Sequence, residues 1–382
     1  MAKQQKIKRY SDRQRTFKAR PRPLGTILTI ILLAGLVALG MMIYEPVKDF
    51  ISQILNPPPV SSSVPAPAPP PMSSSEEASA PPEQPKAPEE IRAAMMPHET
   101  AVYQSGWDAF IAELPVDVNT IMIELKSAEG VVNITSAKTS AVDWGATAED
   151  PISLKMLAEY LEDKGYCFAV RISAFADPFA ARALRGDGAI MYDEVYTWLD
   201  NTPENGGRSW LNPFAPMARE YVVSLATEAA EAGAVLVLLD HVQFPLDYIN
   251  TADYGEFANV TRAEALAALT SELKNALEPH GARGVVYLPV GSLNLPEPAG
   301  NAAYYGGSPL EIVGGEAALG MHLEFLEGET AREKLQNAAN AKALTDEHGI
   351  TLIPVLTATE EVTHNEQIKI IEALGFEEYI LY

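Results

Sequence analysis

The sequence predicts an α/β protein whose folded part is a (β/α)8 TIM barrel, preceded by a single transmembrane helix and a disordered proline-rich linker. Two observations predict the barrel: short apolar segments alternate with helical stretches from about residue 90 onward, and eight such segments are present. Alternating strands and helices form βαβ units and a parallel sheet, and such a barrel takes about 250 residues. A doubly wound open sheet is the alternative, but no Gly-x-Gly-x-x-Gly follows the first strand to support a dinucleotide-binding form of it.

Residues 1–23 form a basic tail, and residues 24–43 form the expected transmembrane helix. The first 22 residues contain nine Lys or Arg and one acid, whereas Leu24 to Ile43 contains no charge. Its length matches a hydrocarbon core of about 30 Å at about 1.5 Å per helical residue. A cleaved signal peptide is the alternative, but its apolar region usually spans only about 7 to 15 residues. The positive-inside rule predicts a single-pass plasma-membrane protein with a cytoplasmic N-terminus and an extracellular C-terminal domain.

Residues 44–89 are expected to be a juxtamembrane segment and a linker rich in Pro, Ser and Ala. Almost no large apolar residues lie there, so this segment has nothing to bury and should form an extended spacer. The whole chain has a formal net charge of −23 although its tail is basic, so the remainder is strongly acidic. Such a surface repels phosphates, which excludes nucleic acid as an expected partner.

Residues 90–382 form the predicted barrel domain. The eight strand candidates are Ile91 to Met96, Thr120 to Leu125, Cys167 to Ile172, Val235 to Leu239, Val285 to Leu288, Met321 to Phe325, Leu352 to Leu356 and Tyr379 to Leu381. The helices expected between them are Gly106 to Glu113, Ser153 to Lys164, Pro216 to Ala232, Arg262 to Glu278, Ala331 to His348 and Asn365 to Leu374.

The fourth strand ends in Asp240, directly after six apolar residues. Such a run is typical of a strand buried on both faces of a parallel sheet. The carboxyl ends of barrel strands build the active site, so Asp240 is the first candidate for chemistry, with a helix or loop cap as its alternative role.

Metal and cofactor sites are not predicted. Cys167 is the only cysteine and lies in a predicted buried strand, where a small core residue is the ordinary interpretation. The six His residues show no His-x-x-x-His or His-Glu-x-x-His spacing that would indicate zinc.

Alternation along the strands predicts which polar side chains meet at the mouth of the barrel. If the inward faces are chosen by the apolar pattern, the side chains that converge are Glu124, Lys126, Arg171, Asp240 and Glu324. For Glu124, Lys126 and Arg171 the alternative to a role in the active site is an ion-pair network that stabilises the barrel. The two roles can coexist, because a basic side chain keeps a neighbouring catalytic carboxylate ionised.

Four segments, in order and spacing, resemble a family of bacterial glycoside hydrolases with an α-amylase-like barrel. They are Thr120 to Lys126 with Gly130, Ala169 to Pro178, Trp210 to Pro213, and Leu239 to Pro245. The resemblance covers roughly residues 90–290. It implies that Asp240 attacks or stabilises the anomeric carbon of a glycan, and it implies substrate contacts by Lys126, Arg171, Asp177, Trp210, His241 and Gln243.

The sequence departs from the pattern of this family at several positions. Gln243 replaces an Arg, Ser127 and Ala128 replace acids, and the fifth strand carries no acid where a proton donor is expected. Glu324 is the first substitute donor and Glu124 the second. The sequence therefore predicts a membrane-anchored hydrolase acting on a cell-envelope or environmental polysaccharide, with a degenerate barrel that binds a glycan or an envelope protein as the alternative.

Overall fold

The computed structural model describes residues 87–382 apart from 138, 194, 247–250, 258, 290–291, 293–298, 322–338, 344 and 359–362. The predicted tail, transmembrane helix, most of the linker and Glu324 lie outside these residues. Among the described residues, no helix combines the length and the apolar character needed to span a bilayer.

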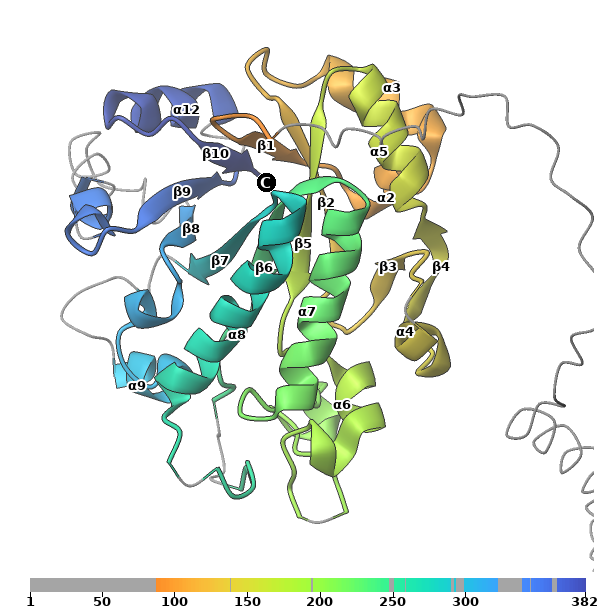
Figure 1. The fold of residues 1–382 in the computed structure, drawn as a ribbon, viewed down its shortest axis with the longest axis vertical. Helices are drawn as coiled ribbons and strands as arrows, with labels where there is room; N and C mark the ends of the chain where they lie inside the picture. The colour runs from red at the N-terminus through yellow and green to blue at the C-terminus, as the bar shows by residue number, and fades with distance from the viewer. Residues whose placement is uncertain are drawn as a thin grey trace, which may run out of the picture. The chain divides into compact units, whose positions relative to one another are not determined.

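Parallel strands form a curled sheet, as Figure 1 shows. In the described part of the chain, pairings run from β1 through β2, β5, β6, β7, β8, β9 and β10 and return to β1, so the ring of strands closes. The strands of this ring are β1 Arg92–Met95, β2 Thr120–Lys126, β5 Cys167–Ser173, β6 Ala234–Asp240, β7 Arg283–Pro289, β8 Glu316–Met321, β9 Thr351–Leu356 and β10 Tyr379–Leu381. The predicted α/β class and parallel sheet are confirmed.

Two separate apolar cores account for this arrangement. An inner cluster, which includes Ala93, Met122, Ala169, Leu238 and Ile380, takes alternate residues from the strands and fills the inside of the ring. The residues between them on the same strands belong to a larger outer cluster under the helices. Strands buried on both faces explain the continuous apolar runs of the sequence, because neither face meets water.

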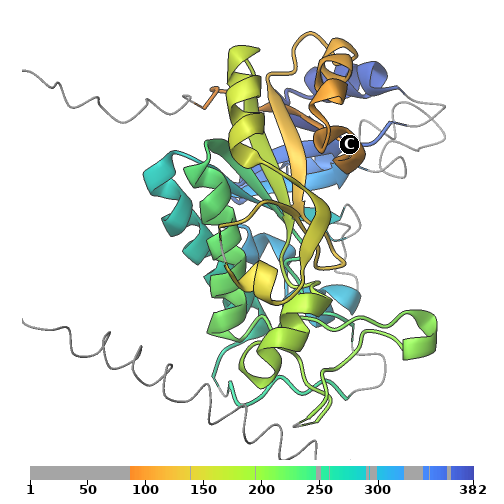
Figure 2. The ribbon, with the colours of Figure 1, turned by 90° about the vertical axis from the view of Figure 1, so that its right-hand side faces the viewer.

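Helices cover the outer face of the sheet. Figures 1 and 2 show α7 (Pro216–Glu231) and α8 (Arg262–Leu277) side by side against β5 to β7. The other described helices are α2 His98–Ala101, α3 Trp107–Ala112, α4 Thr139–Asp143, α5 Leu154–Asp163, α6 Pro178–Leu184, α9 Ala299–Tyr305 and α12 His364–Ala373. Proline begins α7, and a Thr261–Glu264 capping box begins α8, so local sequence fixes where both start.

The sequence missed two short strands that extend the sheet beyond β2. β3 (Val132–Ile134) runs antiparallel to β2, and β4 (Thr147–Ile152) runs parallel to β3. β4 includes Glu149, Asp150 and Pro151, residues that are rare in strands, which explains why alternation did not reveal it.

The predicted sixth strand is displaced. The sequence placed it at Met321 to Phe325, but β8 begins five residues earlier and its described part ends at Met321. Its first residues, Glu316-Ala317-Ala318, have low strand propensity, and only pairing with β7 and β9 makes them a strand. The predicted helix Ala331 to His348 lies largely outside the described residues, which are helical at 339–343 and 345–347.

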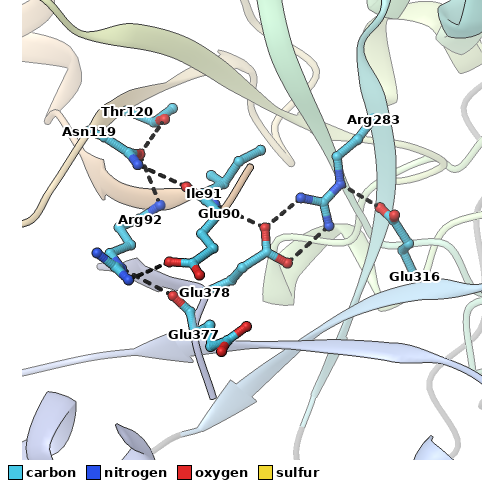
Figure 3. A network of polar contacts seen from close by, with 9 residues as sticks. All are labelled: Glu90, Ile91, Arg92, Asn119, Thr120, Arg283, Glu316, Glu377 and Glu378. Atoms are coloured by element: carbon cyan, nitrogen blue, oxygen red, sulfur yellow. Dashed lines mark hydrogen bonds and ion pairs between the residues drawn. The ribbon is translucent and has the colours of Figure 1, made fainter. Parts of the chain in front are cut away.

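A network of ion pairs ties the strands together at their amino ends, as Figure 3 shows. Arg283, at the start of β7, donates to Glu316 at 2.9 Å and to both carboxylate oxygens of Glu378 at 2.5 and 3.1 Å. Glu378 Oε1 also accepts the backbone N–H of Ile91 at 2.9 Å. The network joins β7, β8, β10 and β1, so it stabilises the end of the barrel opposite the candidate site.

Candidate active site

A pocket of about 400 Å³ opens at the carboxyl ends of the strands. It is lined by Met95, Arg171, Leu238, Asp240, His241, Gln243, Tyr287, Pro289, Val355, Thr357, Ile380 and Tyr382. These residues come from β1, β5, β6, β7, β9 and β10 or directly follow them. Small-molecule sites in barrel proteins usually lie at this end of the strands, and a volume of this size is typical of them.

Asp240 lies in the pocket at the end of β6, a strand whose seven residues are all buried. Its carboxylate pairs with the guanidinium of Arg171 on β5, and its Oδ1 accepts the backbone N–H of His241 at 2.7 Å. Burial alone lowers the pKa of Arg171, but Asp240 raises it above the usual value. Both oxygens of Asp240 therefore face hydrogen-bond donors.

Two aromatic rings lie against Arg171. Its guanidinium carbon is 5.6 Å from the centre of the Tyr287 ring and 4.9 Å from that of Tyr382. Burial, followed by the charge of Asp240, raises the pKa of Tyr287, which is therefore a neutral phenol at neutral pH. The sequence analysis missed both tyrosines. Alternation along the fifth predicted strand places Val285 and Tyr287 on one face, and this pattern could have indicated that Tyr287 faces the pocket.

His241 joins the same pocket in an unusual backbone conformation, with φ of +52°. Its Nδ1 lies 3.3 Å from Ser173 Oγ and 3.5 Å from Asp240 Oδ1. Burial lowers the pKa of His241; Asp240 opposes this effect, and Arg171, Lys126 and Arg208 add to it. The imidazole is therefore neutral at pH 7.

Glu124 lies on β2 opposite Arg171 in the strand register, one strand farther from Asp240. Burial raises the pKa of Glu124; Arg171 lowers it, Glu129 and Asp240 raise it, and His98 lowers it. The effect of Asp240 on the pKa of Glu124 is consistent with their placement on β6 and β2, on either side of Arg171 on β5. Glu124 does not line the pocket itself.

Lys126 and Asp177 form an ion pair away from the pocket. Lys126 Nζ lies 2.9 Å from Asp177 Oδ2, and neither side chain is exposed to solvent. Asp177 Oδ1 also caps α6 by accepting the backbone N–H of Ala180 at 2.8 Å. A bulge between Glu124 and Lys126 sets Lys126 opposite Ile172, a residue of the outer core. Simple alternation therefore failed here, and neither residue of the pair reaches the pocket.

The remaining predicted contact residues differ in position. Gln243 lines the pocket, and its Oε1 accepts the hydroxyl of Tyr305 at 3.4 Å. Trp210 is buried and donates its Nε1–H to Asp200 at 2.9 Å. Its ring packs edge-on against His241 at 6.1 Å between centroids, so it supports the histidine and does not line the pocket. Among the described residues, no group of three or more His, Cys, Asp or Glu could hold a metal ion.

One family model matches part of the chain. Residues 109–287, from within α3 to within β7, match the model of a family described as "Putative glycosyl hydrolase domain" (DUF4015). The match includes Asp240 and ends before β8. A search of curated protein sequences finds no match to the chain.

Among solved structures, the glycoside hydrolase domain of PgaB (BpsB) from Bordetella bronchiseptica has a TM-score of 0.52 and 12% identity, over 77% of this chain and 93% of that one. The two share a fold. The glycoside hydrolase domain of PelA from Pseudomonas aeruginosa has a TM-score of 0.39 and 14% identity, over 77% and 95%. Ega3 of Aspergillus fumigatus, in complex with galactosamine, has a TM-score of 0.38 and 14% identity, over 79% and 94%.

Proposed function

We propose that this protein hydrolyses glycosidic bonds in a polysaccharide and that Asp240 is the carboxylate that acts at the anomeric carbon. The observation that carries the proposal is the position of Asp240: it ends a barrel strand, lines a pocket of about 400 Å³, and is paired with Arg171. Glycoside hydrolysis passes through a transition state with positive charge on the sugar ring, which a fixed carboxylate stabilises or attacks.

The reaction also needs a proton donor for the departing oxygen. The sequence suggested Glu324 or Glu124, and the first lies outside the described residues. Glu124 has the electrostatic character of a donor, because burial raises its pKa and favours the protonated form. We assign it the acid role for a glycan that extends past the residues lining the pocket toward β2, with Asp240 as the second carboxyl group.

A second candidate function is binding of a glycan without turnover. It is favoured by β7, which runs from Arg283 to Pro289 without an acid. In this case the pocket would hold a sugar through Gln243, His241 and the two tyrosines, and Asp240 would only orient Arg171.

One experiment separates the two functions. The purified protein is incubated with a panel of envelope and environmental polysaccharides, and both reducing-end release and binding are measured. Hydrolysis is expected for the native chain, with a loss of about 10³-fold or more in Asp240→Asn but little change in binding. Asp108→Asn, a change of an exposed acid on α3, is the matched control and should keep full activity. Binding without release in every protein would sink the enzyme proposal.

We also propose that residues 24–43 anchor the protein in the plasma membrane and that residues 90–382 lie outside the cell. The support is the uncharged segment after a basic tail. The test is protease treatment of intact cells followed by immunodetection of both ends. Degradation of the C-terminal domain with survival of the tail is expected, and protection of the domain would contradict the proposal.

A further inference from the structure

The first turn of α12 contacts the ends of strands that line the pocket. Figure 1 shows α12 (His364–Ala373) beside β9. The helix begins with a capping box, in which the side chains of Thr363 and Glu366 each accept the backbone N–H of the other, so the residue at which the helix starts is fixed. His364 and Gln367 are three positions apart, which places their side chains on the same face of this turn. Both side chains bind backbone groups that directly follow β9.

Gln367 binds the residue that follows β9. Its side chain is fully buried, and its Nε2 donates to the carbonyl of Thr357 at 2.8 Å. Among the described residues its Oε1 has no hydrogen-bond partner, so the bond to Thr357 is the one that this side chain makes there. Thr357 lines the pocket. Because a buried amide is costly when it is unpaired, this bond holds the carbonyl of Thr357 in place.

His364 connects the end of β9 with the end of β10. Its Nε2 accepts the backbone N–H of Ala358 at 3.2 Å. Burial lowers the pKa of His364, whereas hydrogen bonding to the backbones of Tyr382 and Leu356 raises it, and the effect of burial is the larger. The ring is therefore neutral at pH 7, as acceptance at Nε2 requires. The backbone N–H of Tyr382 donates in turn to the carbonyl of Leu356 at 2.7 Å, so the imidazole interacts with both strand ends at once.

The residues held in this way form the part of the pocket wall that contacts Arg171. Thr357 and Tyr382 both line the pocket, and the guanidinium carbon of Arg171 is 4.9 Å from the centre of the Tyr382 ring. Tyr382 is 51% exposed, so packing restrains it less than it restrains a core residue, and its position depends more on its backbone contacts. No residue of α12, which the structure describes in full, lines the pocket. The helix can therefore act on the pocket only through these backbone contacts.

We infer that His364 and Gln367 are positioning residues of the pocket. They hold the backbones of Thr357 and Tyr382, and the ring of Tyr382 limits where the guanidinium of Arg171 can lie. Groups in a binding site keep a fixed geometry only where supporting contacts of this kind lock them. The inference rests on the proposed function for the use of this pocket as the functional site, but the contacts themselves do not depend on which reaction takes place there.

The first test follows the guanidinium of Arg171 by NMR and requires no ligand. The full chain is labelled with ¹⁵N-arginine, and the Nε–Hε signal of Arg171 is assigned by its absence in Arg171→Lys. An aromatic ring shifts the signal of a proton that lies against its face, so Tyr382→Ala should move this signal. His364→Leu removes the hydrogen bonds of the imidazole and should move the signal in the same direction. His364→Gln keeps both an acceptor and a donor, so it should leave the signal close to its native position.

Two further variants of α12 complete this test. Gln367→Met removes the bond to the end of β9 and should also move the Arg171 signal, whereas Lys369→Met changes an exposed side chain of the same helix and should not. An Arg171 signal that keeps its native position in both His364→Leu and Gln367→Met would overturn the inference. Equal shifts in His364→Leu and His364→Gln, or no shift in Tyr382→Ala, would do the same. If His364→Leu does not fold, Gln367→Met decides alone.

The second test measures kcat and KM on a polysaccharide that the native chain cleaves. His364→Leu should lower kcat/KM by about 10- to 100-fold, because small displacements of site groups have effects of this size, and His364→Gln should restore most of the loss. A native kcat/KM in His364→Leu would refute the positioning role. If no polysaccharide is cleaved but the Arg171 signal responds as expected, hydrolysis fails and the positioning role stands.

Discussion

Replacing Lys126 by Met should destabilise the fold severely, because the change leaves Asp177 buried without its cation. The pair lies at 2.9 Å with both side chains fully buried. Removal of one partner from a buried ion pair costs about 3 to 5 kcal/mol. A contact with substrate would give a different result: weaker glycan binding at nearly unchanged stability.

The surroundings of Asp177 make relaxation difficult. A Cβ atom on Gly130 would lie 2.4 Å from Asp177 Oδ1, which shows how closely the backbone packs on the carboxylate. The same oxygen caps α6, so it cannot turn toward water without uncapping the helix. We therefore expect Lys126→Met to lower the free energy of unfolding by the full 3 to 5 kcal/mol, and the melting temperature by about 6 to 20 °C for a domain of this size.

The assay is reversible denaturant unfolding followed by tryptophan fluorescence, with a double variant to isolate the pair. Lys126→Met with Asp177→Leu removes both charges and should cost only about 1 to 2 kcal/mol, chiefly the lost helix cap, so it should be more stable than Lys126→Met alone. Lys155→Met is the control, because Lys155 is 84% exposed in its pair with Glu159 and should change stability by less than about 0.5 kcal/mol. Additive costs in the double variant, or a native-like Lys126→Met, would refute the reasoning.

Four further outcomes are expected. Arg283→Met should lower the free energy of unfolding by about 2 to 4 kcal/mol without changing kcat, because it leaves Glu378 unpaired at the end of the barrel opposite the pocket; a change in kcat at native stability would contradict this. If Glu124 is the acid, activity should fall as pH rises through its raised pKa, and Glu124→Gln should remove that limb together with most of kcat; an unchanged limb would assign the acid elsewhere. The same raised pKa means that the folded chain binds this proton more tightly than the unfolded chain, so the stability it contributes at low pH is lost as pH rises, and Glu124→Gln should flatten that dependence in unfolding titrations. Tyr382→Phe should bind glycans as the native chain does, whereas Tyr382→Ala should bind them more weakly, because the ring covers Arg171; equal binding of both variants by calorimetry would exclude this role.

Alternation and apolar content were sufficient to predict most of the sheet, because strands buried on both faces leave a continuous apolar run. This holds for β6, which is buried over its whole length and ends in Asp240 as predicted. The same reasoning failed for β8, whose Ala- and Gly-rich residues become a strand only between β7 and β9. Pairing is a property of the closed sheet, and no local pattern encodes it.

The candidate site was predictable only in part. Asp240, Arg171, His241 and Gln243 reach the pocket, since each lies on or directly after a strand with regular alternation. A single bulge in β2 separated Lys126 from them, because one extra residue changes which side chain faces inward. Tyr382 was missed for another reason: it follows the last strand, and only closure of β10 against β9 and β1 brings it to the pocket.

The missing acid on β7 can be understood from what takes its place. Tyr287 lies on that strand and lines the pocket, and its ring contacts the guanidinium of Arg171. A carboxylate there would compete with Asp240 for the same arginine, whereas the phenol leaves the Arg171–Asp240 pair intact. On the proposed hydrolytic function the proton donor comes from another strand, and Glu124 lies opposite Arg171 on β2. The aromatic residue on β7 and the carboxyl on β2 are thus two parts of one arrangement, which the pH dependence of Glu124→Gln tests directly.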